Sequence, residues 1–489
     1  MTLDWHWKSA REIRDAVQSG AVSALDVTEA YLRRIDAVED KVDAYTQRWN
    51  DTARSMATKV DEKVRRGETA GPLAGVPVAL KELLCTRTGK TTCASKMLEN
   101  FRSPYDATVV RRLEEADAVF LGKVNMDEFA MGSSTENSAI KPTRNPWNLR
   151  CVPGGSSGGS AAAVSAGECA LSLGSDTGGS IRQPACLCGC VGIKPTYGRV
   201  SRYGLVAFAS SLDQVGPLTR TVEDAALTLN VICGRDAMDA TSADLPVPDF
   251  TAALTGDIRG LRIGLPKEYF TDALSDQMRE KIEAAIEVFR DHGATIVDVS
   301  LPCSEYAIAV YYIICTAEAS ANLARFDGVR YGFRHPEAKT MQEMYVMSKS
   351  AAFGPEVRRR IMLGTYVLSS GYYDAYYLKA QKVRRLIKKD FDAAFEQCDV
   401  IAGPTSPTPS FEFGAKSDNP LEMYLSDIYT ISVNLATLPG MSVPCGLTEA
   451  GLPVGLQLMA RPFEEETLLR AAHFYEQNRG FDMGRPPVA

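Results

Sequence analysis

The most unusual composition of this 489-residue sequence lies in two stretches, Pro153-Gly-Gly-Ser-Ser-Gly-Gly-Ser160 and Gly174-Ser-Asp-Thr-Gly-Gly-Ser-Ile-Arg182. The first precedes a small-residue segment, 161–166, that predicts a helix, and the second follows an apolar segment, 170–173, that predicts a strand. Glycine has no Cβ, so loops of this kind let backbone N–H groups gather around a ligand. One such loop is typical of a tight turn, but two serine-bearing loops within 30 residues indicate a site.

Outward from these loops, short apolar runs alternate with amphipathic helical patterns. This alternation predicts an α/β fold with a mostly parallel β-sheet. The predicted strands are 76–80, 118–122, 261–265, 294–299, 441–445 and 454–459, and the predicted helices include 107–116, 277–291 and 464–478.

The domain organisation follows from the same patterns. Residues 1–65 predict an N-terminal helical segment, in which the spacing of Ser9 and Glu12 is that of a capping box and Ser23 caps a second helix. Residues 66–489 predict one large α/β domain, because no Pro/Ser-rich linker divides them. Within that domain, residues 308–395 carry almost no strand or turn signal, so we expect a helical insertion there.

Composition excludes several classes of protein. The formal net charge of -7 argues against nucleic-acid binding by this chain alone, although a local patch or a basic partner remains open. No apolar run approaches the roughly 18 residues of a membrane span, the best being 307–315. The N-terminus lacks the apolar core of a signal peptide. We therefore expect a cytoplasmic protein whose twelve cysteines are reduced core thiols.

Three catalytic motifs match the glycine-rich loops in part. Gly155-Ser-Ser-Gly-Gly159 fits the nucleophile elbow of Ser-His-Asp hydrolases, but no apolar strand precedes it, and of the four histidines only His335 remains possible as a base. Asp176-Thr-Gly178 fits the aspartic-protease triplet, but no second copy exists. Neither loop has the Gly-Lys-Ser/Thr of a phosphate-binding loop.

A metal site is not expected. The four histidines are dispersed, and Cys186, Cys188 and Cys190 alternate, which predicts that they point to one side of a strand. Apolar packing explains them better than zinc, because no complementary Cys/His pair is evident.

With histidine and metal set aside, a serine nucleophile needs another base, and Lys81 is a candidate. It stands at the end of the apolar strand 76–80, where α/β folds place their sites. Burial would lower the pKa of its ammonium and make a neutral amine available. Taken by itself, however, Lys81 also fits a strand-end lysine that reaches solvent.

The sequence as a whole resembles the amidase signature family. The resemblance is carried by long motifs at 154–160, 174–184, 192–204 and 209–219. Within the family, the stretches 126–137, 323–332 and 368–377 are similar to the glutamine-hydrolysing subunits of tRNA-dependent amidotransferases. The resemblance implies a central mixed, mostly parallel β-sheet covered by helices on both faces, with a helical insertion.

The resemblance also implies a Ser–Ser–Lys triad. By motif match, Ser180 is the nucleophile, Ser156 is the bridging serine whose peptide is cis in the family, and Lys81 is the base; the two serines have the family spacing of 24 positions. Backbone N–H groups of Thr177, Gly178, Gly179 and Ser180 would form the oxyanion hole.

For a glutamine substrate, the family suggests three further side chains. Arg360 would hold the α-carboxylate and Asp427 the α-ammonium, with Tyr311 beside them; taken alone, Arg360 and Asp427 also fit a solvated helix face and a helix cap. The implied partners are the B and C subunits of a heterotrimer and, through the complex, aminoacyl-tRNA. The chain itself is expected to carry no cofactor and no metal, with ATP and Mg used by a partner in the complex.

Two features remain open at this stage. Glu82 follows Lys81 where the family usually has Asp, and the basic residues Lys379, Lys382, Arg384, Arg385, Lys388 and Lys389 fit a solvated helix face better than a tRNA contact. The alternatives in function are a free-standing amidase acting on small amides and a catalytically silent scaffold protein. Arg360 and Asp427 argue against the first, and the intact Lys81, Ser156 and Ser180 argue against the second.

Overall fold

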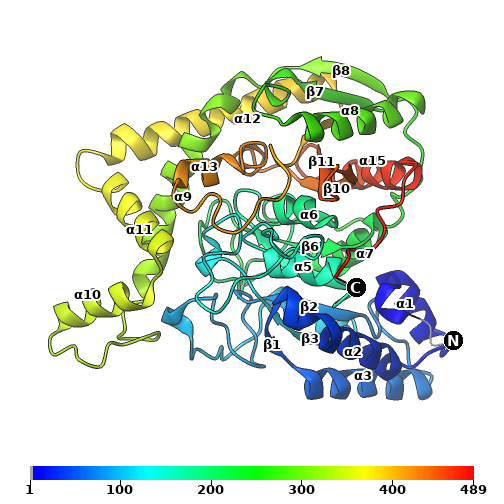
Figure 1. Cartoon of the computed structure of the whole chain (residues 1–489), viewed down its shortest axis with the longest axis horizontal. Coiled ribbons are helices and arrows are strands. Elements are labelled where there is room, and N and C mark those ends of the chain that lie inside the picture. The colour runs from blue at the N-terminus through cyan, green and yellow to red at the C-terminus, as the bar shows by residue number, and fades with distance from the viewer. Residues whose placement is uncertain (1–3, 489) are drawn as a thin grey trace.

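One eleven-stranded β-sheet organises the computed structural model, which describes residues 4–488 (Figure 1). The strand order is β1-β3-β2-β4-β6-β5-β10-β11-β9-β7-β8. The strands are β1 (Tyr45–Arg48), β2 (Pro77–Lys81), β3 (Val119–Val124), β4 (Leu171–Asp176), β5 (Val191–Lys194), β6 (Gln214–Thr219), β7 (Arg262–Pro266), β8 (Thr295–Val299), β9 (Val400–Pro404), β10 (Gly440–Leu447) and β11 (Pro453–Met459).

The sheet is mixed, as expected, but the expectation that it is mostly parallel is wrong. Parallel pairing is confined to β2 with β3 and β4, and to β7 with β8 and β9. The pairs in the middle of the sheet, from β4–β6 through β5, β10 and β11 to β9, are antiparallel. A short turn joins β10 to β11, and such a connection can only form an antiparallel hairpin.

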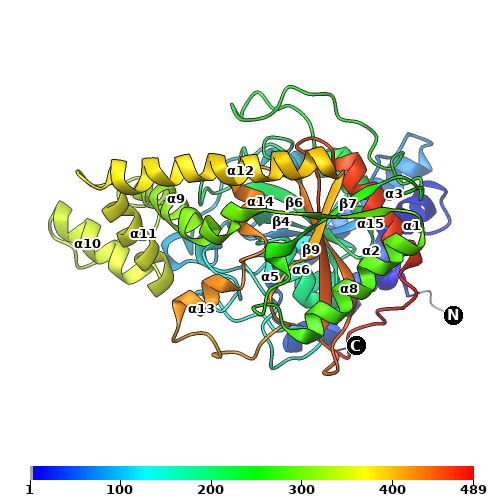
Figure 2. The same cartoon turned by 90° about the horizontal axis from the view of Figure 1, so that it is seen from above.

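Helices cover the sheet on both faces, as the edge-on view of Figure 2 shows for α12 on one side and α5, α6 and α8 on the other. The helices are α1 (Ala10–Gln18), α2 (Ala24–Val42), α3 (Asn50–Arg65), α4 (Thr108–Glu115), α5 (Gly158–Ser165), α6 (Arg182–Cys188), α7 (Val222–Ile232), α8 (Asp276–Asp291), α9 (Ala307–Asn322), α10 (Met341–Ala352), α11 (Pro355–Val367), α12 (Lys379–Gln397), α13 (Pro420–Leu425), α14 (Ile431–Leu435) and α15 (Glu465–Asn478).

The N-terminal segment confirms its helix signals but is not wholly helical. Ser9 and Glu12 form both halves of the expected capping box at α1, and Ser23 caps α2. Strand β1, which was not predicted from the sequence, pairs with β3 at the sheet edge. It has only four residues, three of them polar or charged, so its alternation was too short to stand out.

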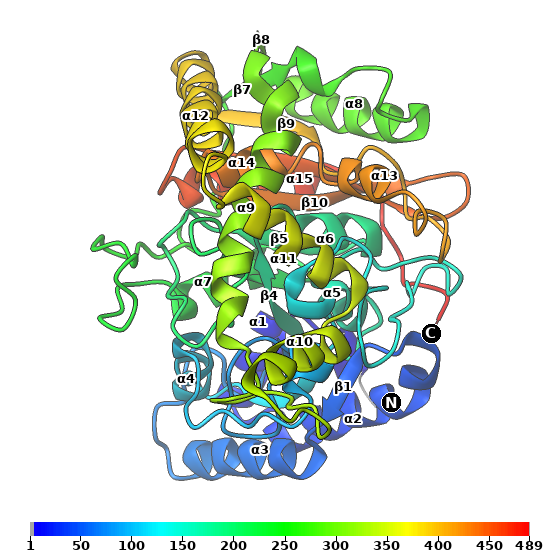
Figure 3. The same cartoon turned by 90° about the vertical axis from the view of Figure 1, so that its left-hand side faces the viewer.

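Helices α9, α10 and α11 project together at one end of the molecule, at the left of Figure 1 and toward the viewer in Figure 3. One continuous helical stretch, Pro302–Arg325, contains α9 and has the length and apolar composition of a membrane span, which was not expected from the sequence. Half of its most apolar window is buried inside the protein, and buried core helices pass the same test, so this is weak evidence for a membrane helix.

The prediction that Cys186, Cys188 and Cys190 alternate along a strand is wrong. Cys186 and Cys188 belong to α6, which ends at the left-handed Gly189, and Cys190 directly precedes β5. Short apolar runs are ambiguous between strand and buried helix, and this one is a helix. All three thiols are buried, and the twelve cysteines are free.

Candidate active site

Lys81 ends β2 inside the protein and does not reach solvent. Its Nζ lies 2.8 Å from Ser156 Oγ, 2.8 Å from Ser157 Oγ and 2.9 Å from Ser175 Oγ. Burial lowers the pKa of Lys81 to about 7, against the opposing effect of the nearby carboxylates, first Asp127. An amine with this pKa is available as a neutral base near physiological pH.

The three hydroxyls around Lys81 are not equivalent. Ser157 Oγ donates its proton to the carbonyl of Ser175 at 3.1 Å, so it has none left for Lys81. Ser156 Oγ has no such acceptor among residues 4–488, and it follows a cis Gly155–Ser156 peptide bond. Ser156 is therefore the hydroxyl that can exchange a proton with Lys81.

Ser180 lies in the turn between β4 and α6, at the surface end of the same cluster. Its side chain is 9% exposed, whereas Lys81 and Ser156 are fully buried. The backbone ties the two loops together, because Ser157 N donates to the Ser180 carbonyl at 3.1 Å. Ser180 Oγ makes no hydrogen bond to any residue that the structure describes, so this hydroxyl is free to meet a substrate.

The amides of the Ser180 turn divide into two groups. The Gly179 N–H donates to Asp176 Oδ1 at 2.8 Å, so it is not free for an oxyanion in this structure. The amides of Thr177, Gly178 and Ser180 have no protein acceptor within the described part of the chain. These three remain as candidate donors, and the expected set of four is reduced by Gly179.

Two glycines let α9 and the segment between α13 and α14 approach this turn. A Cβ on Gly178 would lie 2.8 Å from the Tyr311 hydroxyl, and a Cβ on Gly179, whose φ is +142°, would lie 2.2 Å from Thr430 Oγ1. Thr430 Oγ1 also donates to the Gly178 carbonyl at 2.7 Å. Only glycine fits at either position, and Tyr311 therefore lies directly against the turn that carries Ser180.

Asp176 holds the turn rigid and does not act as an acid. Arg182 contacts its carboxylate through Nε and Nη2, both at 3.0 Å, and both side chains are fully buried. Burial alone would raise the pKa of Asp176, but Arg182 keeps it at about 2. Gln457 and Asn434 accept the remaining Arg182 donors. The Asp-Thr-Gly match is thus explained by a structural ion pair.

Arg360, on α11, is buried, with its guanidinium between aromatic rings. Its Cζ lies 5.2 Å from the ring centre of Tyr312, 5.4 Å from that of Tyr424 and 5.6 Å from that of Phe208. Its Nε donates to Glu356 Oε1 at 2.8 Å. The expectation of a solvated helix face is wrong for Arg360, and the side chain is positioned for recognition of an anion.

Asp427, between α13 and α14, presents an unpaired oxygen. Ser133 Oγ donates to Asp427 Oδ2, whereas Oδ1 is buried without a partner in the described structure. Burial raises the pKa of Asp427 to about 7, against the lowering effect of the Ser133 hydrogen bond. A cationic ligand group would satisfy Oδ1, because buried carboxylates are stable when paired.

Comparison with known proteins assigns the family. Residues 26–469 match the family model described as Amidase. The chain belongs to the amidase signature family. The A-type polypeptide of glutamyl-tRNA(Gln) amidotransferase from Carboxydothermus hydrogenoformans is 59% identical over 99% of this chain and all of its own length. The protein of the same name from Geobacillus thermodenitrificans is 58% identical over 97% of this chain and 98% of its own length.

Solved structures of the family agree. The crystal structure of the same glutamyl-tRNA(Gln) amidotransferase polypeptide from Thermotoga maritima has a TM-score of 0.83 and 42% identity, covering 99% of this chain and 98% of that one. The peptide amidase of Stenotrophomonas maltophilia has a TM-score of 0.83 and 32% identity, covering 98% of each chain. The fold predicted from the family resemblance is thus confirmed as the amidase signature fold.

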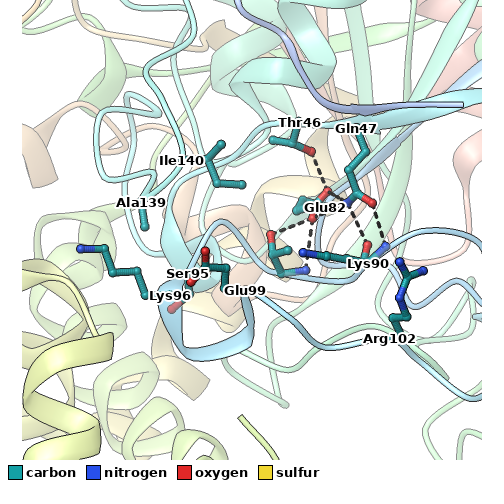
Figure 4. Close-up of a pocket in the computed structure, with 11 residues that line it drawn as sticks. Thr46, Gln47, Glu82, Lys90, Ser95, Lys96, Glu99, Arg102, Ala139 and Ile140 are labelled. Carbon is teal, nitrogen blue, oxygen red and sulfur yellow. Dashed lines mark hydrogen bonds between the residues drawn. The ribbon is translucent and has the colours of Figure 1, made fainter. Parts of the chain in front are cut away.

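Glu82, the departure from the usual Asp of the family, lies away from the serines at a cavity of about 500 Å³ (Figure 4). Its carboxylate accepts hydrogen bonds from Thr46 Oγ1 at 2.7 Å and Gln47 Nε2 at 2.9 Å, both on β1. Thr92 donates to it through both Oγ1, at 2.7 Å, and N, at 3.1 Å. Glu82 therefore joins the end of β2 to β1 and to the segment around Thr92.

The basic residues of α12 divide between surface and interior. Lys379, Lys382, Arg385 and Lys389 do not share the buried setting of the helix core, as expected for a solvated face. Arg384 is different: it donates to the Leu435 carbonyl at 2.9 Å and to Ser211 Oγ at 2.9 Å. Among the described residues, no group of three or more His, Cys, Asp or Glu is arranged to hold a metal.

Several residues of the site were not predicted from the sequence. They are Ser157 and Ser175 beside Lys81, Arg182 beneath the turn, Ser133 at Asp427, and Tyr312, Tyr424 and Glu356 around Arg360. Ser157, Ser175 and Arg182 lie inside the two glycine-rich loops, and that position is a signal that could have found them. The others come from distant segments, so no local pattern indicates them.

Proposed function

We propose that this chain is the glutamine-hydrolysing subunit of a tRNA-dependent amidotransferase. The observation that carries the proposal is the pair of buried, opposite charges, Arg360 and Asp427, around the turn that presents Ser180. Free glutamine offers the matching pair, an α-carboxylate and an α-ammonium, on the same molecule as its side-chain amide. A small neutral amide would leave both protein charges unused, which disfavours a free-standing amidase.

The first chemical step is attack of Ser180 on the side-chain amide carbon of glutamine. Neutral Lys81 accepts a proton from Ser156, and Ser156 accepts the proton of Ser180 as its Oγ forms the bond to carbon. Because Ser157 has its proton committed to Ser175, the relay runs through Ser156 alone. Collapse of the tetrahedral intermediate expels ammonia, which takes a proton back through the same relay.

The turn itself stabilises the negative charge that develops on the amide oxygen. The free N–H groups of Thr177, Gly178 and Ser180 are the available donors, and one such donor is typically worth about 3 kcal/mol in the transition state. The Asp176–Arg182 ion pair fixes the backbone that carries them. Water then attacks the acyl-enzyme, again with Lys81 and Ser156 as the base system, and releases glutamate.

Ammonia is the product that the complex would use. We propose that the chain assembles with the B and C subunits into a heterotrimer, in which a partner activates glutamyl-tRNA(Gln) with ATP and Mg²⁺ and ammonia converts it to glutaminyl-tRNA(Gln). The proposal places no cofactor in this chain and places the reaction in the cytoplasm, where translation occurs. The names of the relatives support it, since they are the A-type polypeptides of such amidotransferases.

A comparison of amide substrates tests the proposal on the full-length protein. Glutamine is expected to be hydrolysed with a much higher kcat/KM than 4-carbamoylbutanoate, which lacks the ammonium, or 4-aminobutanamide, which lacks the carboxylate. Comparable kcat/KM values for the three substrates and for butanamide would instead support an amidase of broad specificity.

A further inference from the structure

Arg360 is held by one edge only. Its Nε–H donates to Glu356 Oε1 at 2.8 Å, one helical turn earlier on α11. The two terminal nitrogens, Nη1 and Nη2, donate to no protein group within residues 4–488. A guanidinium can bind a carboxylate in bidentate fashion either from the side, through Nε and one Nη, or end-on, through both Nη atoms. Glu356 already uses the side, which leaves the end.

Glu356 is itself fixed from several directions. Tyr424 donates its hydroxyl to Glu356 Oε1 at 2.8 Å, and Arg359 pairs with Oε2. The Tyr424 ring stacks on Tyr312 with centroids 3.9 Å apart, and both rings lie against the Arg360 guanidinium. Neither Arg360 nor Glu356 is more than 8% exposed. The orientation of the guanidinium is therefore determined before any substrate arrives.

The charges of this cluster leave room for one more anion. Arg359 and Arg360 supply two positive charges, and Glu356 supplies one negative charge. A substrate carboxylate on the free end of Arg360 would balance the remaining positive charge. Glu356 thus prevents a buried, uncompensated guanidinium in the empty site without occupying the edge that a ligand needs.

We propose that Glu356 is a positioning residue that aims the Nη1–Nη2 edge of Arg360 at the α-carboxylate of the substrate, so that the carboxylate binds end-on. This inference rests on the proposed function, because it takes Arg360 as the carboxylate-binding residue. It adds a second residue to that binding site and a specific geometry. Glu356 acts through Arg360 and touches neither Ser180 nor the amide.

The test is a double-mutant cycle on steady-state kinetics, with the full-length chain in its complex. Arg360→Ala is expected to raise KM for glutamine by at least about tenfold with kcat changed less than about threefold. Glu356→Ala is expected to raise KM by about tenfold, the size of one charged hydrogen bond. The double variant is expected to be no worse than Arg360→Ala, because Glu356 has no route to the substrate once Arg360 is gone.

The substrate 4-aminobutanamide supplies an independent readout. It lacks the carboxylate, so the KM for this amide is expected to be the same in wild type and Glu356→Ala. The variant Glu356→Gln keeps the side-chain oxygen that accepts from Nε, and we expect it to recover at least half of the loss on a logarithmic scale. Circular dichroism melting checks that each variant is folded, and Arg359→Gln, which removes only the outer ion pair, is the matched control.

The outcomes separate the inference from the function on which it rests. If Arg360→Ala leaves KM for glutamine unchanged, the assignment of Arg360 to the carboxylate is wrong, and the inference fails with it. If Arg360→Ala raises KM but Glu356→Ala does not, the proposed function stands and the role of Glu356 is refuted. Additive effects in the cycle, or equal effects of Glu356→Ala on both substrates, would show a structural role only.

Discussion

Lys81 Nζ lies 2.8 Å from Ser156 Oγ, and both side chains are completely buried. A charged ammonium in such a place is costly unless it is paired, and the partners that it contacts here are neutral hydroxyls. The contact therefore makes chemical sense with Lys81 as a neutral amine that takes a proton from Ser156. The predictions below follow from this relationship and from the residues around it.

The pH dependence of glutamine hydrolysis is expected to report Lys81. Because burial lowers its pKa to about 7, the fraction of neutral base rises as the pH increases through that value. We expect kcat to rise through an apparent pKa near 7 and then to level off. In the enzyme–substrate complex the bound ammonium keeps Asp427 ionised, so kcat isolates Lys81. A kcat that is flat or that falls over this range contradicts the assignment.

Replacement of the lysine tests the same role directly. Lys81→Ala is expected to lower kcat by about 10³-fold, within the range typical of general bases. Lys81→Arg is not expected to restore activity, because a guanidinium stays protonated at any working pH. Glutamate release, measured beside a circular dichroism spectrum, checks both variants. Robust activity in a folded Lys81→Arg protein would remove Lys81 from the role of base.

Asp427 is expected to select substrates by their α-ammonium. Asp427→Ala removes the unpaired Oδ1 and should raise KM for glutamine by about 10- to 100-fold, as for a hydrogen bond between charged groups. The KM for 4-carbamoylbutanoate, which has no ammonium, should not rise. Steady-state kinetics with the two amides measures the difference, and an equal loss with both substrates would show that Asp427 only supports the fold.

Glu82 is expected to matter for stability. Glu82→Ala leaves Thr46, Gln47 and Thr92 without their buried acceptor and should lower the free energy of unfolding by about 3 kcal/mol. Glu82→Asp, which restores the usual family residue with a shorter side chain, should cost less. Urea denaturation followed by fluorescence checks this order, and a neutral effect of Glu82→Ala would show that the network contributes little.

The basic face of α12 gives a prediction about tRNA. Lys382→Glu and Arg385→Glu lie outside the buried core and are expected to leave glutamine hydrolysis unchanged. The isolated chain is expected to bind tRNA only weakly at about 150 mM salt, because a net charge of -7 opposes a polyanion. Filter binding measures this affinity. Sub-micromolar binding that these two substitutions abolish would show that the chain carries its own tRNA site.

Arg384 provides the contrast to these residues. Its contacts with Leu435 and Ser211 tie α12 to the core, so Arg384→Glu is expected to destabilise the protein whatever its effect on tRNA. A lower melting temperature for Arg384→Glu than for Arg385→Glu checks the distinction. Equal melting temperatures would contradict the anchoring role of Arg384.

Local signals in the sequence were sufficient for many elements. Ser9 and Glu12 predicted the start of α1, and the alternation of apolar runs with helices predicted β2, β3, β7, β8, β10 and β11. Strand direction was not predictable, because pairing such as β4 with β6 depends on contacts far apart in the sequence. The residues 186–190 misled for a related reason, since helix α6 is buried on every side and leaves no periodic pattern.

The candidate site shows the same division. The two glycine-rich loops and the strand-end lysine were visible in the sequence, and the structure brings Lys81 and Ser156 into contact. Glu356 and Ser133 were not visible, because each acts on a partner that the fold places beside it. Gly179 lost its expected role for the same reason, since only the structure shows its N–H turned toward Asp176.

The central claim is that Ser180 of this chain releases the ammonia that the complex uses. The most direct test measures glutaminyl-tRNA(Gln) formed by the complex containing Ser180→Ala, with glutamine or with ammonium chloride as the nitrogen source. The account predicts that the glutamine-dependent reaction is lost and the ammonium-dependent reaction is retained. Glutamine-dependent product from the assembled variant, or loss of both reactions in a folded complex, would contradict it.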